Sequence, residues 1–218
     1  MSMINVLIAD DHRIVREGLK QVLADANDII VVAEADNGDQ AIAQVQQHIA
    51  RPLHVVLLDI AMPQKDGLEV LQALRKTWPT LGILMLSTYP EQQYAVRCIE
   101  LGASGYLNKS ADPDDMIAAV RKVASGGIYV TPATAEALAG AIAGTNRKSG
   151  TQALSHREHQ VFELLTLGHS VSEIGAKLQL ASNTVSTYRT RILEKTGTKN
   201  DVELALFAER KALRKPIP

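Results

Sequence analysis

Short apolar runs alternate with longer amphipathic segments over the first 125 residues of the chain. The runs span 4–9, 29–35, 54–58, 82–86 and 104–107, and several of them are continuously apolar, which is typical of strands covered on both faces. Between them, apolar positions recur at the helical period over about 13–25, 38–48, 66–77, 91–102 and 112–125. Strict alternation of strand and helix predicts an α/β fold with a doubly wound, five-stranded parallel sheet.

Polar residues stand where three of these predicted helices begin. Asn37 is followed three residues later by Gln40, and Asp66 by Glu69, which is the spacing of a side-chain cap. Asp112 precedes a proline and further acids, the usual order at a helix N-terminus. These signals support the predicted helix starts.

The last third of the chain has the helical period throughout and carries the signals of four short helices. Capping boxes that begin at Ser155 and Ser170 open the first two. Ser182 can cap the third, which runs to about residue 196 and ends at Gly197, and the fourth spans about 201–213. About three residues separate the second helix from the third, which is the spacing of a helix-turn-helix. We therefore predict a small all-α, four-helix domain.

Three parts are expected along the chain: an α/β domain over 1–125, an extension helix and linker over 126–152, and the helical domain over 153–218. Within the middle part, a helix is predicted from 132 to 143 and a polar linker over 144–152. Residues 1–146 carry 11 Lys and Arg against 17 Asp and Glu, a charge of −6, and the remainder carry 12 against 7, a charge of +5. An acidic N-terminal part and a basic C-terminal part indicate two tasks, and the basic part is suited to binding a polyanion.

Composition is ordinary for a soluble globular chain, with 46% hydrophobic and 22% charged residues. Cys98 is the only cysteine, which excludes a disulfide framework and a cysteine-rich metal site and fits a reducing cytoplasm. We expect Cys98 to be a buried helix residue.

Five polar side chains follow the predicted strands, at the edge where doubly wound sheets bind ligands. Asp10 and Asp11 come after the first strand and Asp59 after the third. Converging carboxylates repel one another unless a cation joins them, and hard oxygen ligands suit Mg²⁺ beside phosphate. Ser87 after the fourth strand and Lys109 after the fifth supply a hydroxyl and a cation for phosphoryl oxygens. A carboxylate held this way can be the nucleophile that forms an aspartyl phosphate.

Each of these signals has a plainer explanation when taken alone. A pair of acids after a strand often only caps a helix, and a lysine in a loop is usually just solvated. Their joint order on one edge of the sheet favours phosphoryl chemistry.

Several motifs carry a resemblance to a known family. IADDH, LLDIAMPQKDG, LMLST and GASGYLNKS resemble the receiver domain of bacterial two-component response regulators, which has a flavodoxin/CheY-like sheet. The stretch from LSHREHQVFELL to NDVELALFA resembles the LuxR-type helix-turn-helix domain. The combination is that of the NarL/FixJ family of transcriptional regulators, and Tyr188, where most of that family has His, is similar to the GacA/BvgA-like branch.

The resemblance implies that Asp59 accepts a phosphoryl group from a phosphohistidine of a sensor histidine kinase. It also implies Mg²⁺ as cofactor, bound directly by Asp11 and Asp59, mostly through water by Asp10, and by the backbone carbonyl of Ala61. A dimer that regulates transcription by sequence-specific binding to double-stranded DNA is implied as well.

Further roles in the receiver follow from the same resemblance. Lys109 would pair with a phosphoryl oxygen, Ser87 would hydrogen-bond it, and Tyr106 would swing inward as Ser87 moves. Pro63 and Gly67 would shape the loop over the site.

The third helix of the basic domain is expected to enter the major groove. Val185, Tyr188 and Ile192 recur at helical spacing and form its inward stripe. The base-edge candidates on its other side are Ser186, Thr187 and Thr190, and the residues that open this helix, Ser182, Asn183 and Thr184, are candidates for contact with DNA. The candidates for phosphate contact are Arg189, Arg191, Lys195, Lys177 and Lys199.

The final predicted helix, 201–213, is more apolar than a capping helix needs to be. Use as a homodimer contact and packing into the core are both open explanations. A two-fold dimer would read half-sites about one helical turn apart.

Ala61 and Tyr89 flank the phosphoryl site in the family. Ala61 is too small to orient an attacking water and Tyr89 is large enough to obstruct one, which predicts slow self-dephosphorylation. Simple packing of Tyr89 on the surface is the alternative.

Two other functions compete with this interpretation. A haloacid-dehalogenase-like phosphatase also places a nucleophilic Asp after a strand, but it needs a second Asp two residues later, where this chain has Ala61. A receiver that works without phosphate is disfavoured because all five polar site residues are present. We therefore expect a regulator rather than an enzyme, without a membrane partner.

Overall fold

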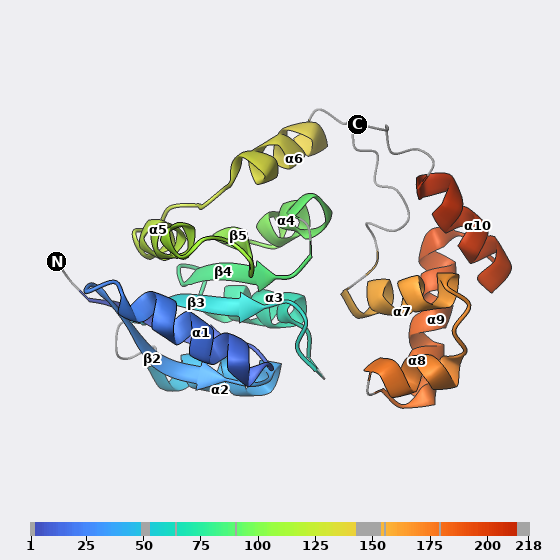
Figure 1. Ribbon diagram of the computed structural model, residues 1–218, viewed down its shortest axis with the longest axis horizontal. Coiled ribbons are helices and arrows are strands. Elements are labelled where there is room, and N and C mark those ends of the chain that lie inside the picture. The colour runs from blue at the N-terminus through green and yellow to red at the C-terminus, as the bar shows by residue number, and fades with distance from the viewer. Residues whose placement is uncertain are drawn as a thin grey trace. The chain divides into compact units, whose positions relative to one another are not determined.

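The computed structural model describes residues 3–48, 53–63, 65–89, 91–142, 154, 156–178 and 180–212. They fall into two compact units, Met1–Asn146 and Arg147–Pro218 (Figure 1). The linker predicted over 144–152 and the capping box predicted at Ser155 lie outside the described residues.

The first unit contains one parallel sheet with the strand order β2-β1-β3-β4-β5. Its strands are β1 Ile4–Ala9, β2 Ile29–Ala35, β3 Leu53–Asp59, β4 Gly82–Ser87 and β5 Gly105–Asn108. The chain leaves β1 toward β2 and returns to pair β3 on the other side of β1, so the strand order reverses between β1 and β3. The predicted doubly wound sheet is confirmed, and such sheets bind ligands beyond the strand ends at this reversal.

Helices cover both faces of the sheet (Figure 1). On one face lie α1 Arg13–Ala24 and α5 Pro113–Ala124, and on the other lie α2 Gly38–His48, α3 Gly67–Thr77 and α4 Glu91–Glu100. Successive residues of β3 feed the two layers in turn, since Val55 belongs to the α1/α5 cluster and Val56 to the α2/α3/α4 cluster. This alternation explains why a strand buried on both faces reads as a continuous apolar run.

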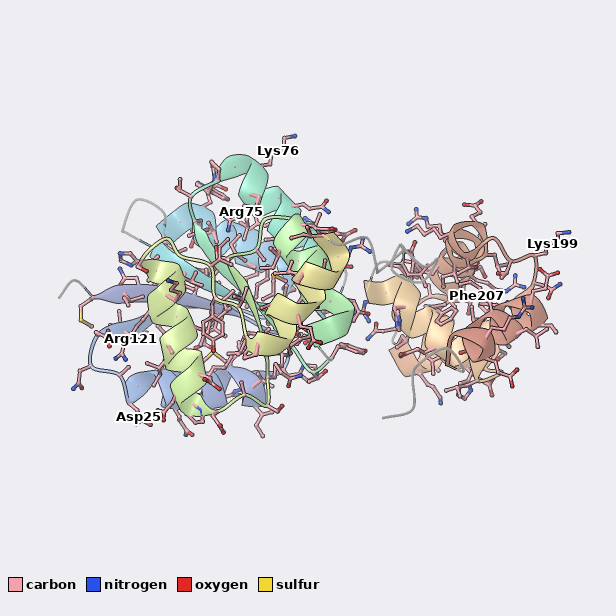
Figure 2. All side chains as sticks on the ribbon, turned by 90° about the horizontal axis from the view of Figure 1, so that it is seen from above. Asp25, Arg75, Lys76, Arg121, Lys199 and Phe207 are labelled. Atoms are coloured by element: carbon pink, nitrogen blue, oxygen red, sulfur yellow. The ribbon has the colours of Figure 1, made fainter. Side chains whose placement is uncertain are left out.

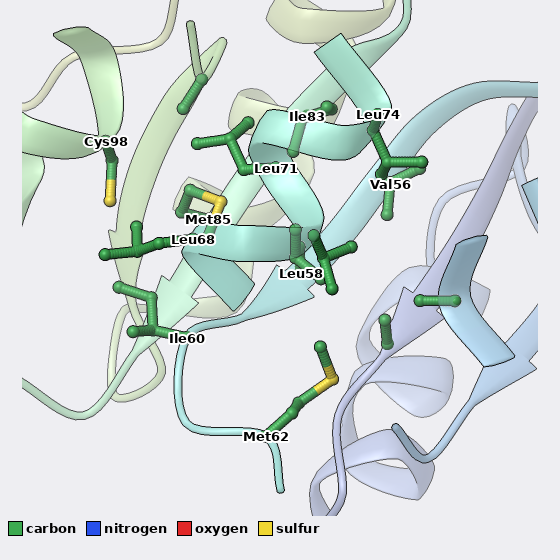
Figure 3. Packing of buried hydrophobic residues seen from close by; sticks show 14 of the residues in the cluster. Val56, Leu58, Ile60, Met62, Leu68, Leu71, Leu74, Ile83, Met85 and Cys98 are labelled. Atoms are coloured by element: carbon green, nitrogen blue, oxygen red, sulfur yellow. The ribbon is translucent and has the colours of Figure 1, made fainter. Parts of the chain in front are cut away.

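The larger buried cluster packs α3 against the sheet (Figure 3). Leu68, Leu71 and Leu74 recur along one side of α3 and belong to the same buried cluster as Val56 and Leu58 of β3. Cys98 of α4 is fully buried in the same cluster, as predicted, and burial raises the pKa of its thiol to about 12.

The predicted caps of this unit are mostly confirmed. Asp66 accepts a hydrogen bond from the backbone N–H of Glu69 at 2.9 Å and completes a capping box at the start of α3. Asn37 accepts from the backbone N–H of Gln40, also at 2.9 Å. Asp112 occupies the N-cap position of α5 and Pro113 the first turn, but the Asp112 side chain makes no capping bond.

The predicted extension helix is present as α6, Pro132–Ile142. The hydroxyls of Thr131 and the fully buried Thr134 both donate to the Glu91 carboxylate in the first turn of α4. This carboxylate joins α6 to α4.

The described residues of the second unit form four helices, α7 His156–Thr166, α8 Val171–Leu178, α9 Ser182–Thr196 and α10 Asp201–Ala212. Its core contains Leu154, Val161, Phe162, Leu165, Ile174, Val185, Ile192 and Leu204. The capping box at Ser170 is confirmed, because the Ser170 N–H donates to Glu173 at 2.8 Å and Ser170 Oγ accepts from the Glu173 N–H.

The two ends of α9 differ in how well the sequence predicted them. Gly197 ends α9 as predicted, with the left-handed φ of +69° that favours glycine. The prediction that Ser182 caps this helix is wrong: Ala181 holds the N-cap position, and Ser182 is the first helical residue. Ala181 has no polar side chain to signal that start.

Among the residues described, no helix combines the length and the apolar character needed to span a bilayer.

Candidate functional site

The predicted acids and Lys109 meet at the carboxyl edge of the sheet. Asp10 follows β1, Asp59 is the last residue of β3, and Lys109 follows β5. Lys109 Nζ lies 2.6 Å from Asp10 Oδ2 and 3.0 Å from Asp59 Oδ1. Both carboxylates are buried, so one ammonium group joins two carboxylates in a site with little access to water.

Burial and charge oppose each other at Asp59. Burial raises the pKa of the Asp59 carboxyl above its ordinary value and outweighs the Lys109 charge, which acts to lower it. Burial acts to lower the pKa of Lys109, but the Asp59 and Asp10 carboxylates outweigh it and leave that pKa raised. The lysine therefore stays charged between the two acids.

The site also has capacity for a further cation. Ligand atoms of Asp10, Asp11, His12 and Asp59 all lie within 4.8 Å of one another. Asp59 Oδ2 is buried and has no hydrogen-bond partner among the described residues. A buried carboxylate oxygen without a partner is costly unless a cation or donor joins it, so this atom points to a ligand.

His12 is a member of this group that sequence reasoning missed. Its Nδ1 lies 2.7 Å from Asp11 Oδ1, and its backbone N–H donates to Asp10 Oδ1 at 2.8 Å. Its position directly after the two acids was the available signal.

The end of β4 and the loop that follows form a hydrogen-bonded unit. Ser87 is buried, and its Oγ accepts from the Tyr89 backbone N–H at 3.1 Å. The Tyr89 carbonyl accepts from the Tyr106 hydroxyl at 2.8 Å and from Asn108 Nδ2 at 3.2 Å. Tyr106 is fully buried, so its ring already occupies the inward position in this structure. Asn108, which lies directly before Lys109, was not predicted.

Gly67 is required by close packing at the loop over the site. A Cβ at this position would collide with the backbone carbonyl of Asp59. The Gly67 N–H donates to the Ile60 carbonyl at 3.0 Å, and the Lys65 N–H donates to the Pro63 carbonyl at 2.8 Å. These bonds turn the described residues of the loop, 61–63 and 65–67, back against the end of β3.

Tyr89 also makes a ring contact. Its centroid lies 5.4 Å from that of the buried Tyr94, with the planes tilted by 57°. This contact supports packing of the Tyr89 side chain, and the predicted obstruction of water stays a prediction.

The outward side of α9 has the composition that the sequence suggested. Val185 and Ile192 are fully buried and Tyr188 is half-buried, which confirms the inward stripe. The exposed residues are Ser182, Asn183, Thr184, Ser186, Thr187, Thr190, Arg191, Glu194 and Lys195. Asn183, Thr184, Thr187, Tyr188 and Arg191 line a shallow surface depression.

Two of the predicted base-edge hydroxyls are bonded within the helix. Thr187 Oγ1 donates to the Asn183 carbonyl at 3.0 Å, and Thr190 Oγ1 donates to the Ser186 carbonyl at 3.1 Å. Each hydroxyl must accept a hydrogen bond, or turn outward, to contact a base.

The predicted phosphate-contacting cations differ in their surroundings. Arg189 Nε lies 2.8 Å from Asp201 Oδ1, and Lys195 Nζ lies 2.6 Å from an oxygen of the buried Glu158. Lys177 Nζ lies 3.0 Å from His169 Nε2. Arg191 and Lys199 are exposed, and Figure 2 shows Lys199 projecting from its unit.

Some apolar residues of α10 pack into the core and others lie on the surface. Leu204 is fully buried in the helical core, and the half-buried Phe207 packs against that core. Val202 and Leu206 remain 71% and 45% exposed. Core packing accounts for the first pair and leaves the second pair as apolar surface.

Two family models match the chain, one for each unit. Residues 6–121 match the response regulator receiver domain, and residues 152–208 match the bacterial regulatory proteins of the luxR family.

Relatives of known name match over nearly the full length. The chain is 42% identical over 204 residues to the transcriptional regulatory protein UhpA of Escherichia coli K12, with 93% of this chain and 96% of UhpA covered. It is 37% identical over 211 residues to the response regulator GacA of Pseudomonas aeruginosa, with 95% and 96% covered.

A solved structure is similar over the same extent. This is RcsB of Salmonella enterica serovar Typhimurium bound to promoter rprA in the presence of the phosphomimetic BeF3−. The identity is 27%, the TM-score is 0.59, and the match covers 94% of this chain and 98% of RcsB.

Proposed function

The chain belongs to the NarL/FixJ family of two-component response regulators, and from this premise we propose that Asp59 accepts a phosphoryl group from a sensor histidine kinase. The phosphorylated protein then regulates transcription in the cytoplasm by binding specific DNA sequences as a dimer. The relatives are named as a transcriptional regulatory protein and a response regulator, which favours a regulator over the phosphatase alternative.

One observation carries the proposal: the Lys109 ammonium lies 3.0 Å from one oxygen of the buried Asp59 carboxylate, while the other oxygen has no partner among the described residues. Transfer from a phosphohistidine breaks the N–P bond and forms a bond between phosphorus and an Asp59 oxygen. Lys109 supplies a fixed positive charge where charge develops on the phosphoryl oxygens. The phosphohistidine retains the electron pair of the broken bond on its ring nitrogen.

The donor set fits Mg²⁺, because the carboxylates that follow β1 lie close to the Asp59 carboxylate at the end of β3. Asp59 Oδ2 has no hydrogen-bond partner among the described residues. Asp10, Asp11, Asp59 and the Ala61 carbonyl would hold the ion, which when bound supplies charge for the transferring phosphoryl group.

Ser87 and Tyr106 would report the change to the rest of the receiver. The phosphoryl group adds about −1.5 to −2 charges at a site already rich in acids, so a donor such as the Ser87 hydroxyl is drawn to it. Movement of Ser87 would disturb the Tyr89 backbone bonds and through them Tyr106. Phosphorylation would then shift the balance between two states rather than create a new one.

DNA contact is assigned to the outward side of α9 and the cations around it. The exposed residues that open the helix, with Ser186, Thr187 and Thr190, would face base edges. The residues assigned to phosphates are Arg189, Arg191, Lys195, Lys177 and Lys199. A dimer through Val202 and Leu206 of α10 would cover the apolar surface that the core leaves exposed.

Intact-mass spectrometry after incubation with acetyl phosphate and Mg²⁺ tests the phosphoryl site. We expect the wild type to gain the mass of one phosphoryl group and Asp59→Asn to gain none. Asp112→Asn, which removes an exposed acid near the same edge, is the control and should gain mass normally. Equal labelling of Asp59→Asn and wild type would overturn the proposal.

Genome-wide footprinting of the wild type against Asp59→Asn tests the regulatory part. Sites occupied only by the phosphorylatable protein are expected, with paired half-sites about one helical turn apart. Identical occupancy by both proteins would show that phosphate does not control DNA binding.

The proposal includes slow self-dephosphorylation. Tyr89→Ala would open the phosphoryl site to water, and Ala61→Asn would add a group able to orient it, so both should speed phosphoryl loss measured from the protein mass over time. If neither variant loses phosphate faster, Tyr89 only packs against Tyr94.

A further inference from the structure

Arg16 connects α1 to the loop that carries the paired acids. Its side chain is only 14% exposed, and its Nη1 donates to the backbone carbonyl of Asp10 at 2.7 Å. Its Nε donates to Glu34 Oε2 at 3.1 Å, and Lys20 Nζ holds the other oxygen of Glu34 at 2.8 Å. Arg16 thus lies between the end of β1 and a carboxylate on β2.

The Asp10 carbonyl belongs to the peptide group that joins Asp10 to Asp11. β1 ends at Ala9, so the strand ladder no longer provides this carbonyl with a donor. The Asp10 N–H still donates to the Ala35 carbonyl at 3.0 Å. With its N–H held by β2 and its carbonyl held by Arg16, Asp10 has little freedom to turn, and the direction of Asp11 follows from it.

The charges around Arg16 balance. Arg16 and Lys20 are positive, and Glu34 and Glu17 are negative, with Lys20 Nζ also 2.9 Å from Glu17 Oε1. The network therefore adds no net charge beside the acidic site. Its most direct link to that site is the bond from Arg16 to the Asp10 carbonyl, which acts on the geometry of the ligands.

We propose that Arg16, oriented by Glu34, is a positioning residue that sets the cation affinity of the site formed by Asp10, Asp11 and Asp59. The inference rests on the proposed function, since it concerns the divalent cation of the same site. Ligands fixed before binding lose less freedom when the ion arrives, and groups that orient ligands strongly affect metal affinity.

Binding of Mn²⁺ to the full chain, followed by electron paramagnetic resonance with Mg²⁺ as competitor, tests this directly. Arg16→Met keeps an unbranched apolar stem but removes the guanidinium and its donors, and we expect the dissociation constants to rise by about 10-fold. The final extent of labelling by acetyl phosphate at saturating Mg²⁺ should match the wild type, because the reacting groups are unchanged. If Arg16 only stabilised the fold, its loss would lower the cation affinity and the extent of labelling together.

Arg121→Met is the matched control. Arg121 makes a similar two-point bridge, with bonds of 2.9 and 2.7 Å to Asp28, and within the described part of the chain its side chain bonds to Asp28 rather than to the acidic site. Its loss should leave Mn²⁺ affinity within about 2-fold of the wild type, the scatter expected for a surface ion pair. If Arg16→Met and Arg121→Met bind Mn²⁺ alike, the inference is wrong.

A conservative pair keeps the test decisive if Arg16→Met does not fold. Arg16→Lys replaces the planar guanidinium fork by a single ammonium nitrogen, which does not reproduce the two bonds in the same geometry, and should weaken Mn²⁺ binding by about 3-fold. Glu34→Gln keeps an acceptor oxygen for Arg16 and should stay near the wild type. Wild-type affinity in a folded Arg16→Lys variant would overturn the role of Arg16. A wild type that binds cation but never labels with acetyl phosphate would instead count against Asp59 as phosphoacceptor and leave the role of Arg16 intact.

Discussion

The acidic site of the first unit and the outward side of α9 in the second are built on opposite principles. At the acidic site, side chains from three strand ends meet, and a single ammonium lies within 3.0 Å of two buried carboxylates. On α9 one helix supplies most of the candidate residues, and those assigned to base edges are short and exposed. The first site concentrates its function in a few contacts, whereas the second distributes it over many.

The cations show the same contrast. Lys109 has its partners inside the site where it would act. Arg189 and Lys195 are paired with acids of their own unit, Asp201 and Glu158, which help to hold the helices together. Breaking one contact between buried charges costs a large part of the stability. Each exposed charge contributes only a small free energy to stability.

Lys109→Met should produce the largest effect. It leaves Asp10 and Asp59 as buried acids without their cation, and the free energy of unfolding of the receiver should fall by about 3 kcal/mol without metal. Urea unfolding monitored by the fluorescence of Trp78, the only tryptophan, reports on this unit. Added Mg²⁺ should restore part of the lost stability. Lys76→Met, at an exposed lysine of α3 (Figure 2), is the control and should change little. A metal-free Lys109→Met variant as stable as the wild type would break the contrast.

Lys195→Met should have the next largest effect. Glu158 is 2% exposed and would lose its cation, but Lys195 is itself partly exposed, so we expect a loss of about 2 kcal/mol. Circular dichroism during urea unfolding would show an earlier transition of the helical unit, with the Trp78 transition unchanged. Lys199→Met removes an exposed charge and serves as the control. An unshifted transition in Lys195→Met would mean that this pair contributes no stability.

Arg191→Ala should weaken DNA binding modestly and uniformly. If Arg191 contacts one phosphate, the slope of log affinity against log salt should decrease in magnitude by about 1 on random-sequence duplex DNA. Arg189→Ala should change the slope less, because its guanidinium already pairs with Asp201. Fluorescence anisotropy at several salt concentrations measures both, and a larger change for Arg189→Ala would reverse this assignment.

The smallest effect concerns pH. A hydrogen bond from Lys20, then one from Arg16, lowers the pKa of Glu34 below its ordinary 4.5. The resulting stability is present above that ordinary pKa and is lost as the pH falls through the lowered value. Because Glu34 is partly exposed, we expect only about 0.5 kcal/mol. Glu34→Gln should be slightly less stable than the wild type at pH 7 and equal to it near pH 3, as followed by Trp78. Glu136→Gln, at an exposed acid of α6, should show no such convergence.

The sequence by itself determined the architecture and the membership of the acidic site. The apolar runs predicted both ends of all five strands to within one residue: β1 and β2 match, β3 also includes Leu53 and Asp59, β4 also includes Ser87, and β5 is shifted by one residue. Because parallel strands present their carboxyl ends at one edge, the order of motifs was enough to bring Asp10, Asp59 and Lys109 together. Periodicity and sheet topology are properties of the chain order, so a sequence can reveal them.

Only the tertiary structure decided which partner each long side chain takes. Nothing in the local sequence pairs Arg16 with the Asp10 carbonyl and Glu34, or Lys195 with Glu158, 37 residues away. The start of α9 at Ser182, after an alanine without a capping side chain, was also beyond the local signals. Long flexible side chains reach several acceptors of similar chemistry, and packing of the helices and strands selects among them. That selection depends on distances in space, which the order of residues does not state.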